Sequence, residues 1–93
     1  MEPLSQQEIR DALSNLNGWE QGDDKIKKEF QFGDFKEALA FIVRVGFEAE
    51  KLTHHPGLYN VYNTVKIELS THDAGDKVTQ NDIDLATAIE GII

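Results

Sequence analysis

The chain has 93 residues, of which 40% are hydrophobic, with 17 acidic against 9 basic side chains and a formal net charge of −8. This composition predicts one compact domain over residues 1–93, and the acidic balance argues against direct binding to DNA or RNA, whose phosphates would be repelled. Because there is no cysteine, neither disulfides nor thiolate metal sites can support the fold.

The first predicted elements are a helix and a β-hairpin. The segment SQQE at residues 5–8 has the form of a capping box, and the apolar residues that follow it lie at helical spacing. We therefore expect a helix from Gln6 to about Leu16. Apolar and polar residues then alternate over residues 26–32, behind the turn sequence GDD at residues 22–24, which predicts a hairpin.

A second helix is expected to begin after Asp34 and to run to about Leu52 or Thr53, because an apolar stripe at helical spacing continues over that length. It contains the longest apolar-rich run, ALAFIVRVGF at residues 38–47, which is interrupted by Arg44 and is too short to span a bilayer. The N-terminal sequence also lacks the form of a signal peptide. We therefore expect a cytoplasmic protein without a membrane partner.

A second hairpin is expected over residues 58–71, where two β-rich runs flank a turn at residues 63–64. The sequence leaves its register open. A two-residue turn would pair Tyr62 with Val65, whereas a longer turn would bring Val61 onto that face.

Thr79 and Asp82 form a further capping box, which predicts a last helix that runs to the end of the chain. The element order is therefore α-β-β-α-β-β-α, and the fold class is α+β, with a four-stranded antiparallel sheet and three helices on one face. Because helices on one face leave the other face or an edge bare, we expect a homo-dimer or homo-tetramer that buries this surface.

The three histidines all lie at junctions between predicted elements. Glu50 and His54 are four residues apart at the end of the second helix, so the carboxylate can accept a hydrogen bond from the imidazole. An imidazole held in this way can act as an acid or a base near neutral pH, although a structural ion pair is the alternative. His55 precedes Pro56 and must point elsewhere, and His72 follows the last strand.

A metal centre is the competing interpretation of these histidines. Zinc ligands usually occur four residues apart on a helix or two apart on a strand, and the adjacent His54 and His55 supply neither spacing. The sequence therefore favours proton transfer without a metal.

The pattern Glu50-x-x-x-His54-His55-Pro56, followed by Tyr62, His72 and Asp82, resembles the signature of the pterin-4a-carbinolamine dehydratase family. The resemblance covers nearly the whole chain. The other segments that carry it are GW at residues 18–19, FQF at 30–32, DF at 34–35, AEKL at 49–52, NVYN at 60–63 and LSTH at 69–72.

This resemblance implies an enzyme, a 4a-hydroxytetrahydropterin dehydratase. Such an enzyme removes water from 4a-hydroxytetrahydropterin and yields quinonoid dihydropterin, which recycles the pterin cofactor of aromatic amino-acid hydroxylases. The pterin is the substrate, and no cofactor or metal is implied. The implied partners are this small molecule and, through a functional link, an aromatic amino-acid hydroxylase.

The resemblance also implies roles for individual residues. His54 and His72 act as acid and base, in an order that stays open, and His55 chiefly holds the pterin. The residues that line the pterin beside the histidines are Thr53, Ser70 and Thr71. Glu50 orients His54, and Asp82 supports the site, although its capping position explains it equally well.

Two other functions stay open at the level of sequence. One is a protein-binding module, since animal members of the resembled family stabilise dimers of a homeodomain transcription factor. The other is a pterin-binding protein in molybdopterin metabolism. A binding module predicts sensitivity to changes on an exposed helical face, whereas the enzyme predicts sensitivity at the histidines.

Overall fold

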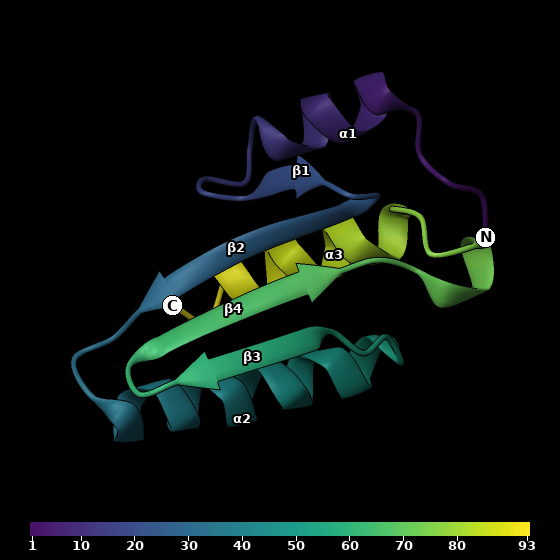
Figure 1. Ribbon diagram of the computed structural model, residues 1–93. Helices are drawn as coiled ribbons and strands as arrows, with labels where there is room; N and C mark the ends of the chain where they lie inside the picture. Colours follow the sequence, from purple (N-terminus) through teal and green to yellow (C-terminus); the bar gives the residue numbers. More distant parts are fainter.

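The computed structural model describes all residues from 1 to 93, and its elements follow the expected order (Figure 1). They are α1 (Gln6–Leu13), β1 (Glu20–Gly22), β2 (Lys25–Gln31), α2 (Phe35–Leu52), β3 (Gly57–Val61), β4 (Thr64–Leu69), the short 3-10 helix η1 (His72–Ala74) and α3 (Gln80–Glu90). The strands form one antiparallel sheet in the order β1-β2-β4-β3. The predicted α+β fold is therefore confirmed.

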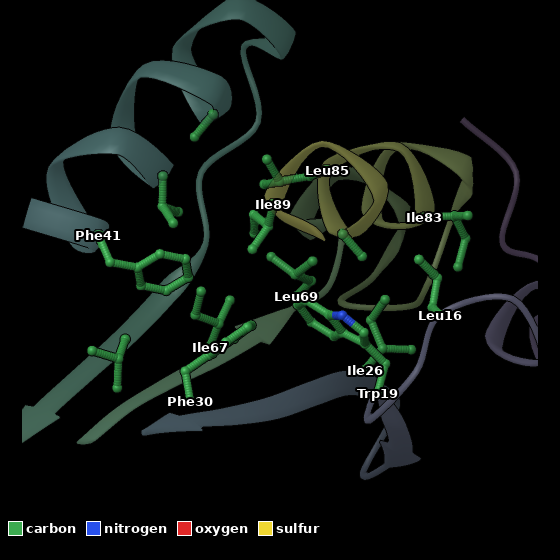
Figure 2. Packing of buried hydrophobic residues seen from close by; sticks show 14 of the residues in the cluster. Leu16, Trp19, Ile26, Phe30, Phe41, Ile67, Leu69, Ile83, Leu85 and Ile89 are labelled. Atoms are coloured by element: carbon green, nitrogen blue, oxygen red, sulfur yellow. The ribbon is translucent and has the colours of Figure 1, made fainter. Parts of the chain in front are cut away.

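The helices pack on one face of the sheet. In Figure 1, α3 lies behind β2 and β4, α2 lies behind β3, and α1 lies beside β1 at the opposite edge. Figure 2 shows the core between these layers. The strand residues buried against the helices are Ile26, Phe30, Val65, Ile67 and Leu69, and the helix residues that meet them include Phe41, Val45, Leu85 and Ile89.

Helix α1 ends at Leu13, earlier than expected. The chain continues in tighter turns, in which the amides of Asn15 and Leu16 donate to carbonyls three residues back. Leu16 is nevertheless buried with Ile9 in the core. The apolar spacing thus marked the buried side of this segment correctly, but it did not mark the end of the helix.

The second hairpin turns one residue earlier than expected. Val61 pairs with Thr64, so the turn lies at residues 62–63, and the prediction of a turn at residues 63–64 is wrong. The turn is held by the residue that follows β2: the Asn63 side chain donates to the carbonyl of Phe32, whose amide donates to the carbonyl of Asn63, each at 2.9 Å. These long-range bonds could not be read from the hairpin sequence itself.

Besides the outer face of the sheet, two further surfaces remain without cover. The outer side of α2 carries exposed apolar side chains at intervals of four residues, Phe35, Leu39, Val43 and Phe47, which we call the α2 stripe. Strand β3 is an edge strand next to it, since it pairs only with β4. No helix is both long enough and apolar enough to cross a membrane.

Candidate active site

The three histidines line one pocket of about 260 Å³, whose lining contains no hydrophobic residue. The lining residues are Thr53, His54 and His55 from the corner after α2, Ser70, Thr71, His72 and Asp73 from the segment after β4, and Asn81 from α3. Thr53, Ser70 and Thr71, which the resemblance places around the pterin, thus lie in the same pocket as the histidines. Larger hollows on the uncovered face of the sheet contain no histidine.

Strand pairing explains why His55 and His72 meet although 17 residues separate them in sequence. Strands β3 and β4 form a hairpin in which Gly57 pairs with Glu68. The start of β3 and the exit of β4 therefore lie side by side, and the residues just outside each end share one corner of the sheet.

His54 is buried, with 8% of its surface exposed, because the chain turns sharply after α2. The helix ends at Leu52, and Thr53 adopts a left-handed conformation with φ 49° and ψ 46°. The amide of His54 then donates to the carbonyl of Ala49 at 3.0 Å. This turn directs the imidazole into the molecule, where its Nε2 lies 2.5 Å from Oδ1 of Asp82.

The Asp82 carboxylate is fully buried and has a complete set of hydrogen-bond donors. Its Oδ2 accepts from the Thr71 hydroxyl and from the Thr79 amide, each at 2.9 Å. Because the Thr71 proton is used in this way, the Thr79 hydroxyl is the donor in the 2.6 Å contact between the two threonines. Asp82 is therefore an acceptor, and His54 donates to it through Nε2–H.

The other ring nitrogen of His54, Nδ1, faces the pocket. It has no hydrogen bond within the chain, and no buried side-chain nitrogen or oxygen of the molecule lacks a partner. Nδ1 must therefore reach solvent, and the pocket is the solvent-filled space that His54 lines. With the proton on Nε2, Nδ1 carries a lone pair that can accept a proton.

Glu50 does not contact His54, so the predicted pairing is wrong. Its Oε1 instead lies 2.5 Å from Nε2 of His55, and both side chains are exposed. The prediction assumed that His54 continues the helix at a spacing of four residues, whereas the left-handed Thr53 ends the helix one residue earlier. Asp82 both completes the capping box of α3 and contacts His54, so its two explanations hold together.

His72 lies at the start of η1 and is almost fully exposed. Its Nδ1 is 3.0 Å from Oδ1 of Asp76. The hydrogen bond with Asp76, then the charges of Asp76 and Asp73, raise the pKa of the His72 imidazole above its ordinary value of 6.5. Sequence reasoning missed Asp76, although its position four residues after His72 was a signal for an ion pair.

Each histidine thus has its own carboxylate: His54 contacts Asp82, His55 contacts Glu50 and His72 contacts Asp76. No group of three or more His, Cys, Asp and Glu side chains has an arrangement that could hold a metal ion. Three imidazoles around one polar pocket can give protons to a bound molecule and take protons from it.

Comparison with known proteins gives consistent matches. Residues 2–92 match the family described as pterin 4 alpha carbinolamine dehydratase. Two proteins provisionally named pterin-4-alpha-carbinolamine dehydratase are each 48% identical to this chain. The protein from Opitutus terrae aligns over 96% of this chain and 92% of its own length, and that from Christiangramia forsetii over 100% and 95%.

Two solved structures share the fold. One is described as a transcriptional coactivator/pterin dehydratase from Brucella melitensis and has a TM-score of 0.92 at 38% identity, over 98% of both chains. The other is described as a pterin dehydratase-like protein that is a RuBisCO assembly factor in the alpha-carboxysome. Its TM-score is 0.68 at 20% identity, over 82% of this chain and 89% of that one, which is a likeness of fold alone.

Proposed function

Because the chain belongs to the pterin 4 alpha carbinolamine dehydratase family, we propose that it removes water from a 4a-hydroxytetrahydropterin and releases quinonoid dihydropterin. The observation that carries this proposal is the polar pocket shared by His54, His55 and His72. The reaction requires one proton to leave N5 of the pterin and one proton to reach the departing 4a-hydroxyl. Groups that titrate near neutral pH are suited to both steps.

The proposed roles are those that the family resemblance implies, and the surroundings of each imidazole are compatible with them. His54 and His72 serve as acid and base, and each has one nitrogen held by a carboxylate and the other free of partners in the chain. His55, which Glu50 holds at the rim, chiefly binds the pterin. Thr53 and Ser70 also line the pocket, whereas the Thr71 hydroxyl is already engaged with Asp82.

The chemistry of the reaction determines which cofactors it requires and which kind of enzyme supplies its substrate. Loss of water changes no oxidation state, so the reaction consumes no redox cofactor, and the pterin is the substrate itself. The 4a-hydroxypterin must come from an enzyme that hydroxylates at the expense of a tetrahydropterin. We propose that this protein recycles the pterin of an aromatic amino-acid hydroxylase.

A stopped-flow measurement tests the function directly. The 4a-hydroxytetrahydropterin is generated by a hydroxylase and mixed with the purified protein or with buffer, and its ultraviolet absorbance is followed. The protein should accelerate the decay with saturation kinetics, and His72→Ala should lose most of the acceleration. A folded wild-type protein that leaves the spontaneous decay unchanged would refute the proposal.

We also propose that the protein is a homo-oligomer. The α2 stripe exposes four large apolar side chains, and Figure 1 shows α2 near β3, whose free edge a second copy of the chain could also cover. The same stripe favours a second candidate function, a protein-binding module. The two functions are separable, because substitutions in the pocket should abolish dehydration and leave a partner bound to α2 unaffected.

A further inference from the structure

Asp76 is a carboxylate beside the pocket that the proposed mechanism has not used. Its side chain extends back across η1 to His72, where Oδ1 lies 3.0 Å from Nδ1 of the imidazole. Nε2 of His72 then has no partner in the chain, and it is the nitrogen left to act on a molecule in the pocket.

The backbone around Asp76 is held in place by hydrogen bonds. The amide of Asp76 donates to the carbonyl of Thr71 at 3.1 Å, and the amide of Thr71 donates to the carbonyl of Lys77 at 2.8 Å. These bonds close a small loop that returns Asp76 to the residue just before His72. The carboxylate is therefore presented to His72 by a fixed turn.

Asp76 also adopts a left-handed conformation, with φ 60°. Glycine is the residue that takes this conformation without steric cost, and Asp and Asn are the next best tolerated. Gly75, immediately before it, is also left-handed with φ 78°. A side chain at position 76 thus carries a small conformational cost, and its visible contact is the one with His72.

We propose that Asp76 is a positioning residue for dehydration, which holds His72 through Nδ1 so that Nε2–H donates its proton to the departing 4a-hydroxyl. This inference rests on the proposed function. It also assigns the role of base to His54. Asp82 holds His54 through Nε2–H, so the lone pair of Nδ1 can accept the proton from the pterin.

The step balances. The N5 proton moves to Nδ1 of His54, the N5–H electron pair forms the C4a=N5 bond, and the C4a–O bond breaks as oxygen takes the proton from Nε2 of His72. Water and quinonoid dihydropterin leave. His54 has gained one proton and His72 has lost one, and exchange with solvent restores both.

The charges around His72 favour the role of proton donor. Asp73 and Asp76 of its own loop are negative. The titratable side chains that line the other side of the pocket are His54 and His55. The nearby Lys77 is engaged with Asp24 at 2.8 Å. The raised pKa of His72 keeps its imidazole protonated to a higher pH, so activity should be lost as pH rises through that pKa.

Two substitutions separate the charge of Asp76 from its hydrogen bond. Asp76→Asn keeps an acceptor for Nδ1–H and removes the charge, whereas Asp76→Gly removes both, and each residue tolerates the left-handed backbone. Asp11→Asn is the matched control, since Asp11 is an exposed carboxylate that pairs with a side chain four residues away, on α1. Circular dichroism confirms that each variant is folded.

NMR titration of the His72 imidazole in the free protein is the first readout. Its pKa should fall in Asp76→Asn and in Asp76→Gly, and should not move in Asp11→Asn. The second readout is the pH profile of kcat, whose basic limb should shift to lower pH in the two Asp76 variants. Above both pKa values, kcat falls about tenfold for each unit by which the pKa falls.

The outcomes distinguish the two proposals. An unchanged His72 titration in both Asp76 variants would overturn the positioning role, as would a lowered pKa with an unmoved kcat profile in an active enzyme. A wild-type protein without dehydratase activity would overturn the proposed function and this role with it. A lowered His72 pKa in the Asp76 variants, together with a basic limb of the kcat profile that shifts to lower pH, supports both the proposed function and the positioning role.

Discussion

At the scale of single residues, two neighbouring imidazoles have opposite surroundings. His54 is buried and donates to a carboxylate that is itself held by two further donors. His55 is exposed, and its contact with Glu50 is a surface ion pair, a class that contributes little to stability. The same substitution at the two positions should therefore have different consequences for stability and for catalysis.

Alanine substitutions at the two proposed proton-transfer residues should differ in stability. His54→Ala leaves a buried oxygen of Asp82 without its donor, so we expect a loss of about 1–3 kcal/mol in urea unfolding. His72→Ala removes an exposed side chain and should leave the melting temperature unchanged. In both variants kcat should fall on the order of 10²–10⁴-fold. Equal stability of the two variants would contradict the buried contact.

His55→Ala should chiefly raise KM and leave kcat nearly unchanged. A residue that holds substrate and transition state equally contributes to binding alone. Glu50→Gln should produce the same change in weaker form, because the amide oxygen can still accept from Nε2 of His55. Steady-state kinetics on both variants check this, and a large fall in kcat would move His55 into the proton-transfer step.

At the scale of elements, the N-terminus of α3 serves the fold and the site together. Its capping box places Asp82 at the third helical position, where one oxygen accepts from the Thr79 amide while the other reaches His54. The helix thus presents the carboxylate at a set distance from the corner after α2. A substitution of Asp82 therefore affects both the fold and the site.

Asp82→Asn should impair catalysis more than stability. The new amide can keep its oxygen toward the Thr71 and Thr79 donors, but its NH₂ group then faces Nε2 of His54. The imidazole must take the other tautomer, with its proton on Nδ1 in the pocket, and it can no longer act as the base. We expect kcat to fall on the order of 10²–10⁴-fold, with the tautomer read from ¹⁵N shifts.

The control for this variant is Asp34→Asn, at the N-cap of α2. Asp34 accepts from the amide of Glu37 and has no contact with a histidine. Because asparagine caps helices about as well as aspartate, neither stability nor kcat should change appreciably. If both variants lost activity to the same extent, the effect would belong to helix capping rather than to His54.

At the scale of the whole molecule, the sheet is covered on one face only, and the helix that carries the α2 stripe lies near the edge strand β3 (Figure 1). The histidine pocket lies beyond the end of this surface, at the corner after α2. Association through the α2 stripe would therefore leave the pocket of each chain uncovered.

Phe47→Glu should dissociate the proposed oligomer. Phe47 is 67% exposed in the single chain, so the substitution costs the monomer fold little, whereas it would bury an unpaired charge in an interface. Light scattering after size exclusion should show a smaller species. Gln6→Glu adds the same charge at an exposed position on α1 and should leave the mass unchanged. A wild-type monomer at micromolar concentration would contradict the oligomer.

The sequence alone determined the features that depend on neighbours within a few residues. Capping boxes at Ser5 and Thr79, a turn within the predicted segment 22–24 and the alternation along β2 all act through local hydrogen bonds and side-chain spacing, and the structure has each of them, with the turn itself at residues 23–24. The three histidines of the sequence pattern likewise share one pocket, although Asp73 and Asn81, which also line it, were not predicted. The register of the second hairpin was beyond local signals, since Phe32, just after β2, holds its turn.

Only the tertiary structure decided which carboxylate meets which histidine. Glu50 stands four residues before His54 in sequence, but the left-handed Thr53 turns His54 inward to Asp82, which lies 28 residues further along the chain. Such a contact depends on the packing of α3 against α2 and β4, and no local spacing encodes it. A pair formed across the core is specified by the whole fold, because burial selects the partner that can satisfy the imidazole away from water.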